Sequence, residues 1–119
     1  MMYAAPMLCL SQQQVSQLLA SCTLYRSHIW RTLPPSPERN QVLRLIQSVQ
    51  GRLMAGQEQT RGEFTLVINQ EEGRALRQML TTVLAIYGQE PASQQRTQRL
   101  GDVAGLRLLL EQTLRQRLE

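Results

Sequence analysis

Cationic and aromatic side chains gather near one predicted helix end in the first half of the chain. All thirteen basic residues are arginine. Residues 1–57 contain five arginines and one acidic residue, whereas residues 58–119 contain eight arginines and eight acidic residues. Arginine beside an exposed aromatic ring can contact phosphates and stack on bases, although compositional bias would also produce such a cluster. The candidate nucleic-acid contacts are Arg26, Trp30, Arg31, Arg39 and Arg44.

Residue types that commonly perform catalysis are sparse, and each has a simpler interpretation. His28 is the only histidine, so a metal site or a histidine-based triad lacks partners. Glu71 and Glu72 fall in the first turn of a predicted helix, where the helix dipole favours negative charge. Cys9 and Cys22 lack C-x-x-C spacing, and Cys22 lies on an apolar helix stripe, where we expect a small buried side chain. We therefore expect no enzymatic activity, no metal, no cofactor and no small-molecule substrate.

The C-terminal part of the chain contains small and apolar residues that favour association between helices. Gly101 and Gly105 lie four residues apart in a predicted helix, and each costs about 1 kcal/mol of helix stability relative to alanine. With Ala104 they form a small-residue groove for another helix, supplied either by the chain's own core or by a partner. Four leucines within residues 106–110 cover too wide an arc for one buried stripe. The candidate protein interface comprises Gly101, Gly105, Leu108 and Leu109.

The chain also repeats itself at a spacing of 57 or 58 residues. Aligning residues 34–53 with residues 91–110 gives six identities in twenty positions, and these are Pro34/Pro91, Ser36/Ser93, Arg39/Arg96, Gln41/Gln98, Leu43/Leu100 and Leu53/Leu110. A fixed internal period indicates a repeated supersecondary unit. We interpret the repeat as a duplication, the alternative being a helix-hairpin pattern that both halves share.

Each copy predicts one short strand followed by two helices. The β-prone runs at residues 7–10 and 64–68 each lead into a helix N-cap residue with a capping-box partner three positions later. Proline-containing corners at residues 34–37 and 90–93 separate the two helices of each copy. The apolar stripes that define the predicted core are Val15, Leu18, Cys22, Tyr25 and Ile29; Val42, Ile46, Val49 and Leu53; Leu76, Leu80, Val83 and Tyr87; and Leu100, Val103, Leu106, Leu110 and Leu114.

These elements predict a mostly α-helical fold with a small two-stranded β ribbon. Tandem β-α-α units would form a four-helix domain around a pseudo-two-fold axis, with the ribbon antiparallel. Residues 1–119 would be one domain, because each copy alone approaches the lower limit for an independent core. The first copy spans residues 6–54, a linker spans 55–62, and the second copy spans 63–119.

This order of elements resembles the ribbon-helix-helix family of DNA-binding proteins, in which two chains each give one strand to an antiparallel ribbon that enters the major groove. The resemblance covers both copies and implies a nucleic-acid-binding, regulatory role. The chain departs from the family in its longer first helices and at the outward ribbon positions. The residues at the outward ribbon positions are Met7, Cys9, Thr65 and Val67. Their side chains cannot make bidentate hydrogen bonds to bases.

Composition and hydropathy indicate the cellular location that we expect for the protein. No apolar run approaches the roughly 20 residues of a membrane helix, and the N-terminus lacks a charged region followed by a long apolar stretch. We expect a cytoplasmic protein, and the lysine-free, glutamine-rich composition suggests a bacterial source. The function that we expect is a small non-enzymatic interaction or assembly module that binds a protein partner or itself through its helices, with a dimer as one form. A nucleic-acid-binding accessory protein is the alternative.

Overall fold

The structure is a computed structural model that describes residues 7–59 and 62–118. The elements in chain order are β1 (Met7–Leu10), α1 (Gln12–Thr32), α2 (Pro37–Gln59), β2 (Phe64–Val67), α3 (Gln70–Gly88) and α4 (Gln94–Leu118). Within these ranges the protein has four helices and a two-stranded antiparallel sheet, which confirms the mostly helical fold with a small ribbon. The helix α2 continues to Gln59, so residues 55–59 of the expected linker are helical.

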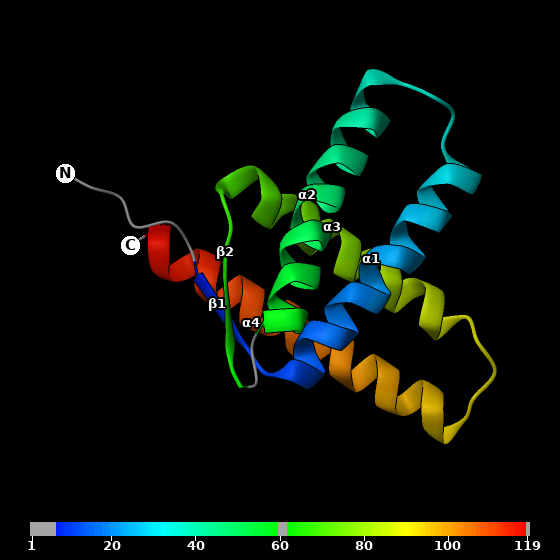
Figure 1. Ribbon diagram of the computed structural model, residues 1–119. Helices are drawn as coiled ribbons and strands as arrows, with labels where there is room; N and C mark the ends of the chain where they lie inside the picture. The colour runs from blue at the N-terminus through cyan, green and yellow to red at the C-terminus, as the bar shows by residue number, and fades with distance from the viewer. Residues whose placement is uncertain (1–6, 60–61, 119) are drawn as a thin grey trace.

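The two strands lie side by side along one side of the helices, and both helix-hairpin turns lie at the opposite side (Figure 1). Leu8 pairs with Leu66, and Leu10 pairs with Phe64. Because successive side chains of a strand point to opposite faces, these positions share the inner face of the ribbon. The three leucines are buried and Phe64 is half-buried, so the inner face of the ribbon closes one side of the core.

Each strand leads directly into a helix whose first turn is capped. The Ser11 hydroxyl accepts a hydrogen bond from the Gln14 backbone N–H, and the Gln14 side chain accepts one in return from the Ser11 N–H, at 2.9 Å. Asn69 and Glu72 form the same reciprocal pair at the start of α3. Both predicted capping boxes are therefore confirmed, and each satisfies N–H groups that have no partner within the helix.

Helix α2 is held against β2 by one charged contact and one aromatic contact. The Arg52 guanidinium forms an ion pair with the buried Glu72 carboxylate, and it also donates a hydrogen bond to the Val67 carbonyl. One turn further along α2, the Phe64 ring lies against the helix backbone at Gly56. A Cβ at Gly56 would lie 2.4 Å from Phe64 Cε2, so the close approach requires glycine.

The four predicted stripes form one core. Every residue of the α1 stripe is buried, and so are the central residues of the other three, whereas Val42, Tyr87, Leu100 and Leu114 are half-buried. Figure 1 shows the α1–α2 pair crossing the α3–α4 pair, which brings the four stripes together. Burial of polar groups was not predicted. Among the residues whose burial is described, the buried polar ones are Ser21, Arg39 and Glu72.

The glycines of α2 provide a matched test of the packing against β2. Gly56→Ala places a methyl group inside the Phe64 ring position, and such overpacking typically costs about 1–3 kcal/mol. Gly51 is exposed and has no neighbouring atom near its Cβ position, so Gly51→Ala should gain up to about 1 kcal/mol of helix stability. Urea unfolding followed by circular dichroism should show Gly56→Ala lowering the free energy of unfolding and Gly51→Ala raising it. Equal effects of the two variants would contradict the packing of Phe64 on α2.

Candidate functional site

Gly101, Gly105 and Leu108 of the candidate protein interface lie on the outer face of α4. The two glycines and the neighbouring Ala104 are exposed, and a Cβ at either glycine would meet no atom of another element within 4 Å. Leu108 follows on the same face and is 56% exposed. The chain's own core therefore does not fill the groove that the small residues form. These four residues are called the outer α4 face below.

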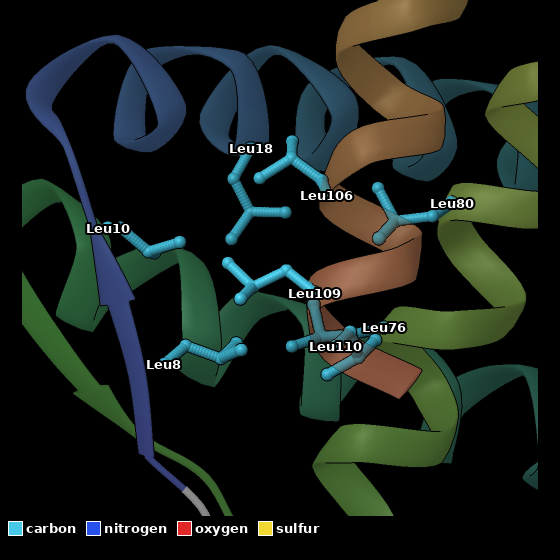
Figure 2. Close-up of a pocket in the computed structure, with 8 residues that line it drawn as sticks. All are labelled: Leu8, Leu10, Leu18, Leu76, Leu80, Leu106, Leu109 and Leu110. Atoms are coloured by element: carbon cyan, nitrogen blue, oxygen red, sulfur yellow. The ribbon is translucent and has the colours of Figure 1, made fainter. Parts of the chain in front are cut away.

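Leu109 lies elsewhere, because it turns toward the core. It is half-buried and lines a small void together with leucines of β1, α1 and α3, as Figure 2 shows. The void has a volume of about 10 Å³ and only leucine side chains around it, so it offers neither room nor polar partners for a water molecule or a ligand. The predicted interface thus divides into Gly101, Gly105 and Leu108 on the outside and Leu109 on the core side.

Arg39 joins the two helices of the first hairpin. The residue is buried, with 5% of its surface exposed. Nη1 donates a hydrogen bond of 2.9 Å to the Leu33 carbonyl at the end of α1, and the guanidinium carbon lies 4.0 Å from the centre of the Trp30 ring. The Arg39 backbone N–H donates to the Ser36 hydroxyl, which caps α2. A cation that binds this carbonyl and stacks on an aromatic face stabilises the hairpin.

The other candidate nucleic-acid contacts do not share one surface. Arg26 is half-buried, and its Nη1 donates a 2.9 Å hydrogen bond to the Gln50 side chain of α2. Arg31 and Arg44 are exposed, on the sides of α1 and α2 that face away from the core. Arg44 follows Arg39 by five positions, which turns it by about 140° around the helix axis. Trp30 is 62% exposed and belongs with Arg26 and Arg39 along the contact between α1 and α2.

A surface pocket opens beside Arg39, and sequence reasoning did not predict it. Its volume is about 280 Å³, and it lies at the turn that joins α1 to α2. It is lined by Tyr25, Ile29, Leu33, Pro34, Ser36, Glu38, Arg39 and Val42. Burial raises the pKa of the Tyr25 phenol above its usual value, which keeps that group neutral. The only sequence signal was the recurrence of an arginine three residues after each hairpin serine.

The outer face of the ribbon is uncharged. Met7, Cys9, Thr65 and Val67 are exposed there, as their outward positions predicted, and none of them supplies a cation or an amide side chain. On α1, Cys22 is fully buried, and burial raises the pKa of its thiol to about 12, although the nearby Arg26 charge lowers it somewhat. His28, also on α1, is half-buried.

Residues 7–59 and 62–118 contain no group of three or more histidine, cysteine, aspartate or glutamate side chains placed to hold a metal ion. No helix in these ranges has the length and apolar character needed to cross a membrane. No family model matches the chain, and neither a curated protein nor a solved structure matches it.

The two cysteines should differ sharply in reactivity. Cys9 is exposed on the ribbon, whereas Cys22 is buried and its pKa of about 12 keeps the thiol protonated at pH 8. Maleimide labelling of the native protein at pH 8, read by mass spectrometry, should modify Cys9 rapidly and leave Cys22 unmodified until the protein is unfolded. The variant Cys9→Ser should lose the rapid reaction. Rapid native labelling of Cys22 would contradict the burial of the α1 stripe.

Proposed function

We propose that this protein is a non-enzymatic interaction module that binds a protein partner or a second copy of itself through the outer α4 face. The observation that carries this proposal is the exposure of Gly101 and Gly105. Two glycines in a helix interior together cost about 2 kcal/mol of stability relative to alanine. Nothing within the described chain packs against them to account for that cost.

Gly73 shows how packing within the chain can account for a glycine in a helix. A Cβ at Gly73 of α3 would lie 2.8 Å from Leu114 Cδ2, so Gly73 allows α4 to pack closely on α3. Gly101 and Gly105 have no such neighbour within the described chain, and unlike the single exposed Gly51 they lie one turn apart on one face, which supports a helix from outside the chain as their packing partner. Leu108 lies beside them and exposes an apolar side chain that such a helix would cover. Small residues flanked by a large apolar one suit close helix packing.

We also propose that the chain is a tandem duplication of one β-α-α unit, with a pseudo-two-fold axis through the ribbon and one shared domain. Several equivalent features support it. The strands pair antiparallel, both first helices begin with a capping box, and both second helices begin after a serine whose hydroxyl accepts from the N–H of an arginine three residues later. That arginine in turn donates to carbonyls at the end of the preceding helix in each hairpin.

The nucleic-acid alternative has weaker support, because only Arg31 and Arg44 of the proposed contacts are both exposed and cationic. Charge reversal at these two positions tests it without disturbing the buried Arg39. We expect no salt-dependent binding of short duplex or single-stranded nucleic acid in fluorescence anisotropy. Binding that weakens steeply with salt and is lost in Arg31→Glu/Arg44→Glu would instead favour the nucleic-acid function.

Alanine at the two glycines should separate stability from association. Gly101→Ala/Gly105→Ala should raise the free energy of unfolding by about 2 kcal/mol, because alanine favours the helix and has space at both positions. The added methyl groups should weaken self-association by about tenfold or more, because they obstruct close helix approach. Analytical ultracentrifugation across a concentration series measures the second effect, and thermal unfolding at low concentration measures the first.

Two further variants serve as controls for that experiment. Leu108→Glu should leave the monomer folded and abolish association, because it puts a charge into the apolar part of the outer α4 face. Gly51→Ala should stabilise the monomer without changing association, because Gly51 lies on α2. A wild-type protein that stays monomeric at every concentration would contradict self-association. Association that persists unchanged in Leu108→Glu would place the interface elsewhere.

A further inference from the structure

A surface groove of about 380 Å³ runs between β2 and the last turns of α2. Every residue of β2 lines it and no residue of β1 (Met7–Leu10) does, so it lies along the edge of β2 that is not paired with β1. Because successive side chains of a strand point to opposite faces, a groove that touches four consecutive residues touches the main chain itself. The lining residues on α2 are Arg52, Ala55 and Gly56. This space is called the β2 groove below.

The main-chain groups of Thr65 and Val67 face the β2 groove. The Val67 carbonyl accepts a hydrogen bond from Arg52, which lines the groove from α2, on the side of β2 away from β1. In an antiparallel pair, residues that bond to the partner strand alternate with residues whose N–H and C=O point away from it. Leu66 therefore exchanges hydrogen bonds with β1, whereas the N–H and C=O of Thr65 and Val67 point into the groove.

These main-chain groups are mostly unpaired. Apart from the bond that Arg52 gives to the Val67 carbonyl, no described residue bonds to the outward N–H and C=O groups of Thr65 and Val67. Such groups at a strand edge form a template for another strand. The usual protection of an edge is missing here, because the strand Phe64–Val67 has no charged residue, no proline and no bulge.

We propose that the β2 groove binds an extended segment of another protein, which adds to the ribbon as a third strand. Main-chain hydrogen bonds to Thr65 and Val67 would hold the segment, as in other cases of strand addition to a sheet edge. Thr65 and Val67 direct their side chains outward, so the residues of the segment that bond to them also point outward. The residues between them point inward, where the small, exposed Ala55 leaves space for an apolar side chain.

The charge of the groove favours an acidic residue at one end of the segment. Arg52 is the charged residue among those that line the groove, and its side chain is 39% exposed. Its ion-pair partner Glu72 is buried behind it, so the solvent-facing side of the pair is cationic. The guanidinium has more N–H donors than its bonds to Ser48, Val67 and Glu72 use. A carboxylate next to Val67 would accept the remaining ones.

A second copy of the chain suits this edge less well than a separate segment does. The β2 of that copy would bring its own α2, because Arg52 and Phe64 hold α2 against β2. Two paired edges would then place two α2 helices along one seam, whereas an extended segment brings only a strand. The groove is built from α2 and β2 and is separate from the outer α4 face, so this site and the proposed function can fail independently.

Fluorescence anisotropy of a labelled peptide with the full chain tests the proposal. The probe is fluorescein-Gly-Glu-Val-Thr-Val-Glu-amide, whose valines alternate with polar residues and whose two glutamates serve either strand direction. It should bind saturably. N-methylation of its threonine removes a main-chain donor and should weaken binding by about tenfold or more. Replacing both glutamates by glutamine should weaken binding by up to about fivefold, the range of an exposed ion pair.

Variants of the protein locate the binding at the β2 groove. Thr65→Pro removes an N–H that points away from β1, so the ribbon keeps its own hydrogen bonds and peptide binding should fall by about tenfold or more. The matched variant Thr65→Val keeps that N–H and should bind as the wild type does. Ala55→Trp fills the groove from α2, so it should block binding even if Thr65→Pro loses its fold in circular dichroism.

Several results would overturn the proposal. They are the absence of saturable binding to the wild-type protein, equal affinities for the peptide with and without N-methylation, and binding that survives Ala55→Trp. A dimer of the wild-type protein that Thr65→Pro dissociates would also overturn it, because a second copy would then occupy the edge.

Discussion

The pairing of β1 with β2 is the contact on which the arrangement of the helices depends. Each strand has four residues, and a two-stranded ribbon is marginal in water unless one face is covered. Burial of Leu8, Leu10 and Leu66 supplies that cover. Since each strand runs straight into an N-cap, the register of the ribbon determines where α1 and α3 begin. The two helix hairpins are thereby placed across one another around a single core.

Several arginine side chains hold the ends of helices to neighbouring elements. Arg39 and Arg96 bind the last carbonyls of α1 and α3, and Arg52 bridges α2 to Glu72 and the end of β2. In a chain without lysine, the planar guanidinium suits this task, because it can serve two acceptors and an aromatic face at once. The excess positive charge of the first half is therefore partly structural.

Local patterns were sufficient to predict the elements and most of the core. The spacing of apolar residues gave the α1 stripe in full, and the Ser11 and Asn69 caps were recognisable because a capping box involves residues only three apart. Long-range packing could not be predicted in the same way. The burial of Arg39 depends on Trp30 and Leu33 across a turn, the core position of Leu109 on the placement of β1, and the need for glycine at position 56 on Phe64.

The sequence by itself determined which segments are helical or extended, where α1 and α3 begin, and which stripe of each helix is apolar, since these follow from local sterics, hydrogen bonding and periodicity. It did not determine the end of α2, which continues to Gln59 through part of the expected linker. Only the tertiary structure decided which small or charged residues remain on the surface. Gly73 and Gly101 are both helical glycines in the sequence, yet α4 packs on the first and no described residue packs on the second. Arg39 and Arg96 occupy equivalent positions, yet only one has its Nε paired. Such differences arise from how separate elements approach one another, because contact energies depend on neighbours that are distant along the chain.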